Sequence, residues 1–259
     1  MRLVDGAEAI RGDLPAAVTH LVDVPLEAGD ERGTGIPRFG SLAIVHERTL
    51  DLLAGLPDIA ITIGGDCSVD LAGIEHANAR AEGDLAVVWF DAHSDANGAE
   101  TSPSGAFAGM VVRALTGAGP LAPAIAIDPT KIVIAGARAF DDGEEEFIAS
   151  AGIRTVGVVE LETPDELVAA VAATGAASVY IHIDVDVLDP AEFGGKSDPV
   201  PFGITAAELI AAIRALRRRF SLAGAAITEF APASTDAAAD DLPTILRIIG
   251  ALTSALPAE

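Results

Sequence analysis

The amino-acid sequence predicts an α/β protein with a mostly parallel sheet that helices cover on both faces. Strand and helix signals alternate along the chain, and this alternation is typical of parallel sheets packed between helices. Short runs rich in β-branched residues, as in buried strands, occur at residues 58–63, 85–90, 131–135, 178–187 and 223–229. Amphipathic helical segments lie before, between and after them, at residues 39–53, 69–81, 142–150, 164–173, 205–219 and 242–256.

Local signals mark the starts of two of these helices and the positions of the loops. Thr163 precedes Pro164, and Thr205 has Glu208 three residues later, which is a capping box. We expect long loops where the sequence has no clear period, and such loops often carry function. These segments are residues 29–38, 97–103, 189–203 and 231–240.

Length and charge limit the domain organisation and the partners. With 259 residues, half of them hydrophobic, the chain can bury a large core as one domain spanning residues 1–259. It has 39 acidic and 16 Lys and Arg residues. This excess repels phosphate backbones and anionic membrane surfaces, so we expect neither nucleic acid nor membrane as a partner. Metal ions and small cationic substrates fit the charge better.

Cysteine content and hydropathy predict a soluble, cytoplasmic protein. Cys67 is the only cysteine, so the chain forms no internal disulfide. The first residues, MRLVDGAEAIRGDLP, lack the long apolar run of a signal peptide. No segment approaches the roughly 18 uninterrupted apolar residues that a membrane helix requires.

Two acidic clusters follow predicted strands and indicate a metal site. Residues two apart share a face in extended backbone, so Asp91, His93 and Asp95 can converge. Asp184 and Asp186 alternate with apolar residues in the same way. A single aspartate could instead cap a helix or a turn, but two clusters favour a divalent cation that offsets repulsion and desolvation. Oxygen ligands with one imidazole suit manganese or magnesium, and we expect one or two manganese ions per chain.

Three segments resemble the signature blocks of the arginase and agmatinase (ureohydrolase) family. They are GGD at residues 64–66, DAHSD at residues 91–95 and HIDVDVLDP at residues 182–190. The resemblance implies a three-layer α/β/α sandwich, a homo-oligomer such as a trimer or hexamer, and two manganese ions. It also implies the metal ligands, which are Cys67, Asp91, His93, Asp95, Asp184 and Asp186.

The resemblance further implies hydrolysis of linear C–N bonds in a small cationic guanidino or amidino compound. Metal-bound hydroxide, oriented by Asp95, attacks the central carbon in this family, and urea or a related amide is released. Glu229 corresponds to the glutamate that pairs with the cationic nitrogens. Asn97 and Ser104 match positions that contact the substrate's amino-acid end, and Asp141 retains one of two expected acidic positions.

The sequence departs from the family pattern at two positions that are usually histidine. Cys67 replaces a metal ligand; a thiolate favours softer ions such as zinc, and a buried, purely structural cysteine is the alternative. Ala108 replaces a proton relay, and general acid catalysis contributes on the order of a hundred- to ten-thousandfold. A catalytically impaired member, acting as a metal- or ligand-binding, regulatory or structural subunit, is therefore the alternative function. Cys67 as a nucleophile is less favoured, because no basic partner lies beside it.

His182 shares the face of the paired aspartates but lies one step deeper in the predicted strand. It stands where the family often has a small residue. We expect it to support the metal ligands rather than to bind the metal, with ligation as the alternative.

Overall fold

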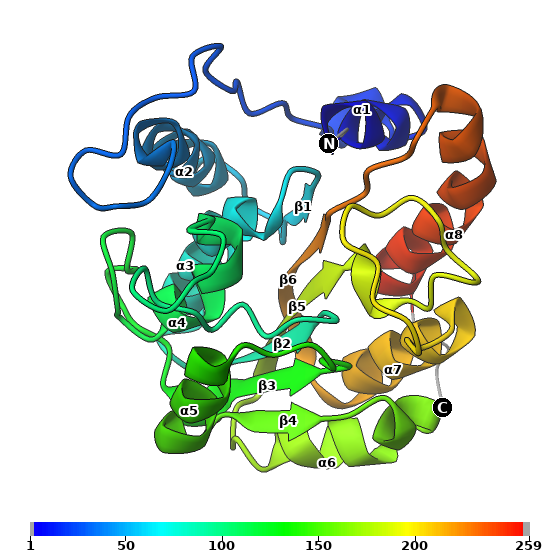
Figure 1. Cartoon of the computed structure of the whole chain (residues 1–259). Coiled ribbons are helices and arrows are strands. Elements are labelled where there is room, and N and C mark those ends of the chain that lie inside the picture. The colour runs from blue at the N-terminus through cyan, green and yellow to red at the C-terminus, as the bar shows by residue number, and fades with distance from the viewer. Residues whose placement is uncertain (1–2, 256–259) are drawn as a thin grey trace.

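The computed structural model describes residues 3–255, and within them six strands form one parallel sheet. The order across the sheet is β1-β6-β5-β2-β3-β4, and every neighbouring pair is parallel. Figure 1 shows the strands with their carboxyl ends at one edge of the sheet. The strands are β1 (Ile61–Ile63), β2 (Leu85–Phe90), β3 (Ile132–Ala135), β4 (Arg154–Val156), β5 (Ser178–Asp184) and β6 (Ser221–Thr228).

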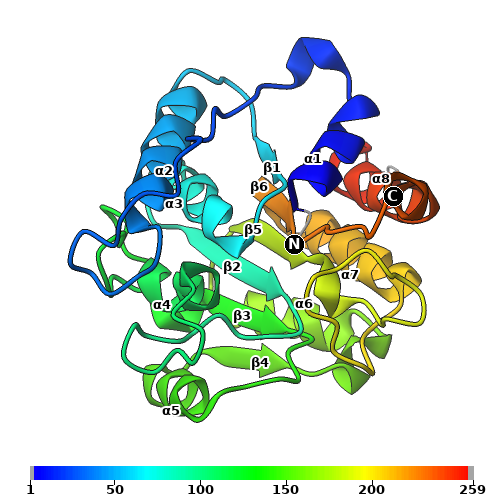
Figure 2. The same ribbon diagram turned by 45° about the horizontal axis from the view of Figure 1, so that its top comes forward.

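Helices cover both faces of the sheet, as Figures 1 and 2 show. One face carries α2 (Phe39–Ala54), α3 (Leu71–Arg80), α4 (Val111–Leu115) and α5 (Asp142–Ala151). The other carries α6 (Asp165–Ala172), α7 (Ala206–Arg219) and α8 (Thr235–Thr253), and α1 (Leu3–Gly12) packs against α8. The predicted α/β fold with a parallel sheet between helix layers is confirmed. No helix in residues 3–255 is long and apolar enough to cross a membrane.

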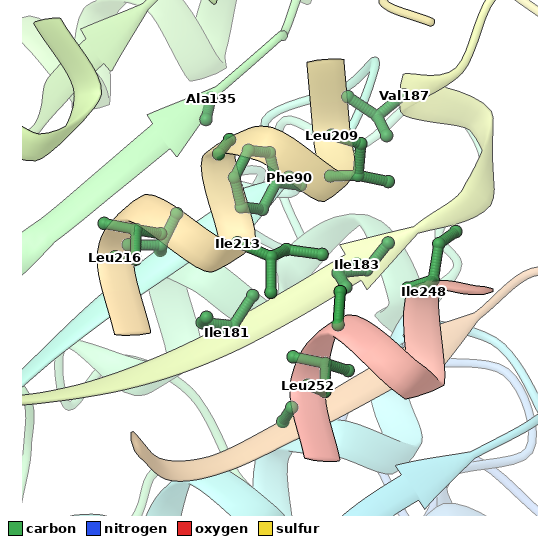
Figure 3. Packing of buried hydrophobic residues seen from close by; sticks show 14 of the residues in the cluster. Phe90, Ala135, Ile181, Ile183, Val187, Leu209, Ile213, Leu216, Ile248 and Leu252 are labelled. Atoms are coloured by element: carbon green, nitrogen blue, oxygen red, sulfur yellow. The ribbon is translucent and has the colours of Figure 1, made fainter. Parts of the chain in front are cut away.

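The two helix layers explain why β2 is apolar throughout. In β2, Leu85, Val87 and Trp89 join the hydrophobic cluster on the α3 side, whereas Ala86, Val88 and Phe90 join the cluster on the α7 side. Because β2 is buried on both faces, apolar residues are favoured at every position, and its sequence shows no alternation. Figure 3 shows Phe90, Ile181 and Ile183 of the sheet packed against α7 and α8.

The structure corrects a predicted strand and a predicted helix, and it adds a strand that was not predicted. Strand 178–187 is too long, because β5 ends at Asp184 and a 3-10 turn, Val185–Val187, follows. β4 was not predicted; it is a three-residue edge strand with one buried residue. Helix α8 begins at Thr235 instead of 242, because the Ser234 hydroxyl accepts the N–H of Ala237 and caps an earlier start.

The predicted C-terminal boundaries and caps have mixed outcomes. The segment 231–240 was expected to be a loop, but α8 occupies its second half. The predicted end of that helix, residue 256, lies outside the described residues. The capping box of Thr205 and Glu208 is present at the start of α7, as predicted.

The helix–sheet packing predicts a large effect of truncating a buried leucine on α7. Leu209 is fully buried in the core, whereas Leu26 is fully exposed. We expect Leu209→Ala to lower the free energy of unfolding by about 2–5 kcal/mol, because it removes contacts and leaves a cavity. The same change at Leu26 should stay within about 0.5 kcal/mol. Urea denaturation of both variants measures this, and equal midpoints would contradict the packing described.

Candidate metal centre

The candidate site lies at the carboxyl edge of the sheet, where β1, β6, β5 and β2 end side by side. Cys67 follows β1, Asp91 follows β2, Asp184 ends β5, and Glu229 follows β6. Parallel strands that are neighbours in a sheet bring their carboxyl ends together. The topology therefore gathers residues that are far apart in the sequence.

A glycine turn delivers Cys67 to this edge. Gly64 and Gly65 have φ values of 94° and 72°, in the left-handed region that glycine adopts without strain. The Asp66 carboxylate then caps the 3-10 helix Cys67–Asp70. The turn and the cap together place Cys67 at the start of that helix, where its side chain is buried.

Backbone amides hold the three central aspartates in place. Asp91 Oδ1 accepts the N–H of His93 at 2.7 Å, and Asp184 Oδ1 accepts the N–H of Asp186 at 2.7 Å. Asp186 Oδ1 accepts the N–H of Ala92 at 2.8 Å, which ties the end of β5 to the segment after β2. The carboxylates are thus oriented by the fold, as ligating carboxylates usually are.

Further side-chain contacts connect the two acidic clusters and Cys67. His93 Nδ1 lies 2.9 Å from Asp186 Oδ2 and 3.4 Å from Asp91 Oδ1. Cys67 Sγ donates to Asp184 Oδ2 at 3.3 Å. Five of the six predicted metal ligands therefore form one connected set.

Three groups of side chains in residues 3–255 have ligand atoms within 4.8 Å of one another. This spacing allows each group to surround one ion. Asp91 belongs to two of the groups, and so does Cys67. The groups are Asp91, His93 and Asp186; Cys67, Asp184 and Glu229; and Cys67, Asp91 and His182.

The sixth predicted ligand, Asp95, is in none of those groups within the described chain, although it lies close to them. Its charge raises the pKa of Cys67, and it interacts with Asp91. Its Oδ2 atom is buried and has no hydrogen-bond partner. An unpaired buried carboxylate oxygen is costly, so Asp95 needs a ligand that supplies a positive charge or a proton.

The electrostatics of the cluster call for a cation. Burial and the charge of Asp186 raise the pKa of Asp91 to about 6. Burial and neighbouring carboxylates also raise the pKa values of Asp95 and Asp184 well above the usual range. Burial opposes the charge on His93, but the hydrogen bonds that His93 donates to Asp186 and Asp91 outweigh it and raise that pKa to about 11. One imidazolium cannot balance so many carboxylates, and the donor set fits a divalent ion.

The two predicted catalytic residues both have strained backbones. Asp95 has φ 49° and Glu229 has φ 62°, in the left-handed region that residues with a Cβ seldom adopt. Such conformations cost of order 1–3 kcal/mol each and persist where the surrounding structure enforces them. Their presence at these two positions fits a functional role.

Glu229 was predicted to bind the substrate, but its carboxylate also lies beside two predicted metal ligands, Cys67 and Asp184. Its Oε2 accepts a hydrogen bond from Ser197 Oγ at 2.5 Å, and its N–H donates to the carbonyl of Gly65. Burial, as the largest cause, raises its pKa to about 7. With Cys67 and Asp184 it forms one of the three ligand groups. The carboxylate can therefore contact either a cationic substrate or an ion.

The three predicted substrate-binding residues separate into two places. Asn97 Nδ2 donates to Asp141 Oδ2 at 2.8 Å, and Asp141 forms a capping box with Glu144 at the start of α5. Ser104 is exposed and accepts the N–H of Ala106 in its own loop. Glu144 is buried, and its Oε1 accepts the N–H of Ala96, so it fixes the loop after β2. The spacing of Asp141 and Glu144, like that of Thr205 and Glu208, could have revealed this cap.

Ala108 lies in the 3-10 helix Phe107–Met110, which packs against the 3-10 helix that carries Cys67. Its side chain is half-buried. The two departures from the family pattern thus occur in neighbouring segments.

Comparison with known proteins agrees with the fold and the motifs. The arginase family model matches residues 13–246. An arginase of Staphylococcus aureus is 32% identical over 182 residues, which are 66% of this chain. The match spans 60% of that arginase, less than two thirds of its length. The N(omega)-hydroxy-L-arginine amidinohydrolase of Streptomyces lavendulae is 30% identical over 233 residues, 89% of this chain and 82% of that protein.

The solved structures include an Entamoeba histolytica arginase in complex with L-ornithine. The two structures superpose with a TM-score of 0.85 at 23% identity. The match covers 97% of this chain and 92% of the arginase chain, which shows a shared fold. With a family model that spans most of the sequence, a matching fold and the motifs at the sheet edge, the chain belongs to the arginase family.

Proposed function

We propose that this protein is a metal-dependent hydrolase of linear C–N bonds in a small cationic guanidino or amidino compound. The observation that supports the proposal is the set of buried and half-buried carboxylates at the ends of three neighbouring strands, β6, β5 and β2, with Cys67 beside them at the end of β1. The names of the relatives, an arginase and an N(omega)-hydroxy-L-arginine amidinohydrolase, point to the same chemistry. Urea or a related amide is the expected product.

In this proposal Asp91, His93, Asp184 and Asp186 hold one or two ions, with Asp95 and Cys67 beside them. Carboxylates and one imidazole favour manganese. Burial, followed by the charge of Asp184, raises the pKa of Cys67 well above its usual value. The thiol must therefore lose its proton on binding an ion, and a softer metal promotes that loss.

A bound divalent ion supplies a nucleophile by lowering the pKa of water and polarises the group under attack. The protein positions the remaining charges. The Asp95 Oδ2 atom, buried and without a partner, can accept a proton or a hydrogen bond from the attacking water. Glu229, with a pKa of about 7, becomes ionised when a cationic nitrogen approaches, because an opposite charge favours the charged form.

The surroundings of the site favour a cationic substrate. Asp198 is exposed and its carboxylate lies 3.9 Å from His93 Nε2. The whole chain carries a formal charge of −23, which attracts cations and repels anions. A guanidinium or amidinium group carries the positive charge that Asp198 and the acidic chain attract.

The second candidate function is a catalytically impaired family member that binds metal or a guanidino ligand. Ala108, which has no titratable group at the family's proton-relay position, favours it. Metal content and turnover together distinguish the two functions.

The main test is a screen for urea release by the manganese-loaded protein. Its substrates are L-arginine, N(omega)-hydroxy-L-arginine, agmatine, guanidino acids and formimino compounds. Hydroxyurea, the product from N(omega)-hydroxy-L-arginine, is measured beside urea, as are ammonia and formamide. We expect turnover on at least one compound, and a loss in kcat/KM of about ten- to a hundredfold in Glu229→Gln, because a charge-assisted contact is removed. Glu166→Gln, on the exposed face of α6, is the control. Bound metal without turnover on any compound would support the impaired member instead.

Restoring the missing relay should increase turnover. We expect Ala108→His to raise kcat on the best substrate by on the order of a hundredfold, because general acid catalysis assists departure of the amine. Ala106→His, two residues earlier and exposed, is the matched control. An unchanged kcat in Ala108→His would contradict a relay at this position.

Metal removal should make stability depend on pH. The folded pKa values of Asp91, about 6, and Glu229, about 7, exceed their unfolded values of about 4, so their stabilising contribution is complete below pH 4 and is lost as pH rises through 6–7. We expect the Tm of the protein in EDTA to fall between pH 5 and 8. A loss of about 2 kcal/mol corresponds to roughly 4–8 °C.

Manganese should restore the Tm, and by more at pH 8 than at pH 5, because ionised carboxylates bind the ion. Asp91→Asn should flatten the pH dependence measured in EDTA. A Tm in EDTA that rises steadily from pH 5 to 8 is the outcome against this electrostatic account.

A further inference from the structure

We propose that His182 is a metal ligand through Nε2, in a position formed with Cys67 and Asp91. This inference rests on the proposed function, because it assumes that the centre binds metal. It reverses the expectation that His182 only supports the ligands. Four observations on this residue carry it.

The first observation is that the His182 ring has a fixed plane. The residue is fully buried, and its position on β5 is in register with Trp89 on β2. The two rings are stacked, with centroids 3.4 Å apart and planes 7° from parallel. The indole also donates to Asp91 Oδ2 at 3.0 Å, so one side chain orients both the imidazole and a carboxylate of the proposed ligand set.

The second observation is that the buried carboxylate of Asp70 lies next to the Nδ1 atom of the His182 ring. His182 Nδ1 lies 2.9 Å from Asp70 Oδ2, and Asp70 is fully buried. The Tyr180 hydroxyl donates to the other oxygen of Asp70. An ionised carboxylate accepts hydrogen bonds, so this network places the imidazole proton on Nδ1 and leaves a lone pair on Nε2. Metal-binding histidines usually have this arrangement, with the second ring N–H donated to a carboxylate.

The third observation is that Nε2 has no hydrogen-bond partner although it is buried. An unsatisfied buried polar atom destabilises the fold, and an apolar side chain stacked on Trp89 would avoid that cost. A cation at Nε2 removes the penalty. A purely structural histidine leaves it unexplained.

The fourth observation is the distance between the potential donors. A ring nitrogen of His182, Cys67 Sγ and a carboxylate oxygen of Asp91 all lie within 4.8 Å of one another. Zinc–nitrogen and zinc–sulfur bonds are about 2.0–2.3 Å long, so ligands around one ion have such separations. Since Nδ1 is engaged by Asp70, Nε2 is the nitrogen that is free to bind an ion.

The donor set specifies the kind of metal. Imidazole nitrogen, thiolate and carboxylate together favour zinc or cobalt(II), whereas the group of Asp91, His93 and Asp186 favours manganese. The centre would thus have a softer position on the Cys67 side and a harder one on the His93 side. Asp91 belongs to both groups and would join them.

The experiment is a titration of the metal-free, full-length protein with cobalt(II) chloride, followed by absorption spectroscopy and elemental analysis. For the wild-type chain we expect a thiolate-to-cobalt charge-transfer band. His182→Asn keeps a donor where Nδ1 lies but removes Nε2, so the affinity of the ion that gives this band should fall at least a hundredfold. Asp70→Asn should weaken it by roughly ten- to a hundredfold, the usual effect of losing the partner of a ligating histidine.

His76→Asn is the matched control, because His76 is half-buried on α3, outside the three ligand groups in the described chain. Circular dichroism and Tm establish that the variants are folded. The inference is overturned if folded His182→Asn binds cobalt with the wild-type affinity and band, and an unchanged Asp70→Asn overturns the role given to Asp70.

The proposed function fails in a different way. A wild-type chain that binds neither cobalt nor manganese removes the basis of both proposals. Wild-type binding and turnover that persist unchanged in His182→Asn overturn the inference alone.

Discussion

The structure depends on one electrostatic constraint: several carboxylates are buried together where parallel strands end. Asp91, Asp95 and Asp184 repel one another in a region that excludes water, and burial alone would keep them protonated. Backbone N–H groups hold Asp91 and Asp184 there, and His93 lies against Asp91. A bound cation would turn this unfavourable arrangement into a favourable one, so the proposed metal affinity and chemistry would rest on the same residues as the stability.

The scaffold isolates this constraint from the rest of the molecule. Two hydrophobic clusters, one on each face of the sheet, stabilise the strands without help from the polar edge. The core can therefore tolerate an edge that is under strain, because the strand ends are fixed by residues such as Phe90 and Ile183 directly behind them. The hydrophobic core thus fixes the positions of the strand ends, and the polar side chains at the carboxyl edge form the candidate site.

Much of the fold was predictable because buried parallel strands have a simple sequence signal. The apolar run 85–90 coincides with β2, and the helix predicted at 205–219 differs from α7 by one residue. The predictions failed where a polar contact decides the structure. The Asp184 carboxylate ends β5 by accepting the Asp186 N–H, and Ser234 caps α8 before its most apolar part.

The site was predictable to the same degree and for similar reasons. Alternation along a strand brought Asp91, His93 and Asp95 into one hypothesis, and the edge rule for parallel sheets joined them to Asp184 and Asp186. The pairing of His182 with Asp70 was not predictable. It joins residues 112 positions apart and depends on how the 3-10 helix Cys67–Asp70 packs on β5. No local pattern encodes that contact.

The left-handed backbone at Asp95 and Glu229 has an evolutionary consequence. Glycine adopts this conformation without strain, so replacing either residue with glycine would relieve the backbone and remove a repelled carboxylate in one step. Substitutions that only increased stability would therefore remove these two side chains, since function and stability commonly oppose each other at active sites. The two carboxylates thus stand at positions where glycine would be expected to give a more stable chain.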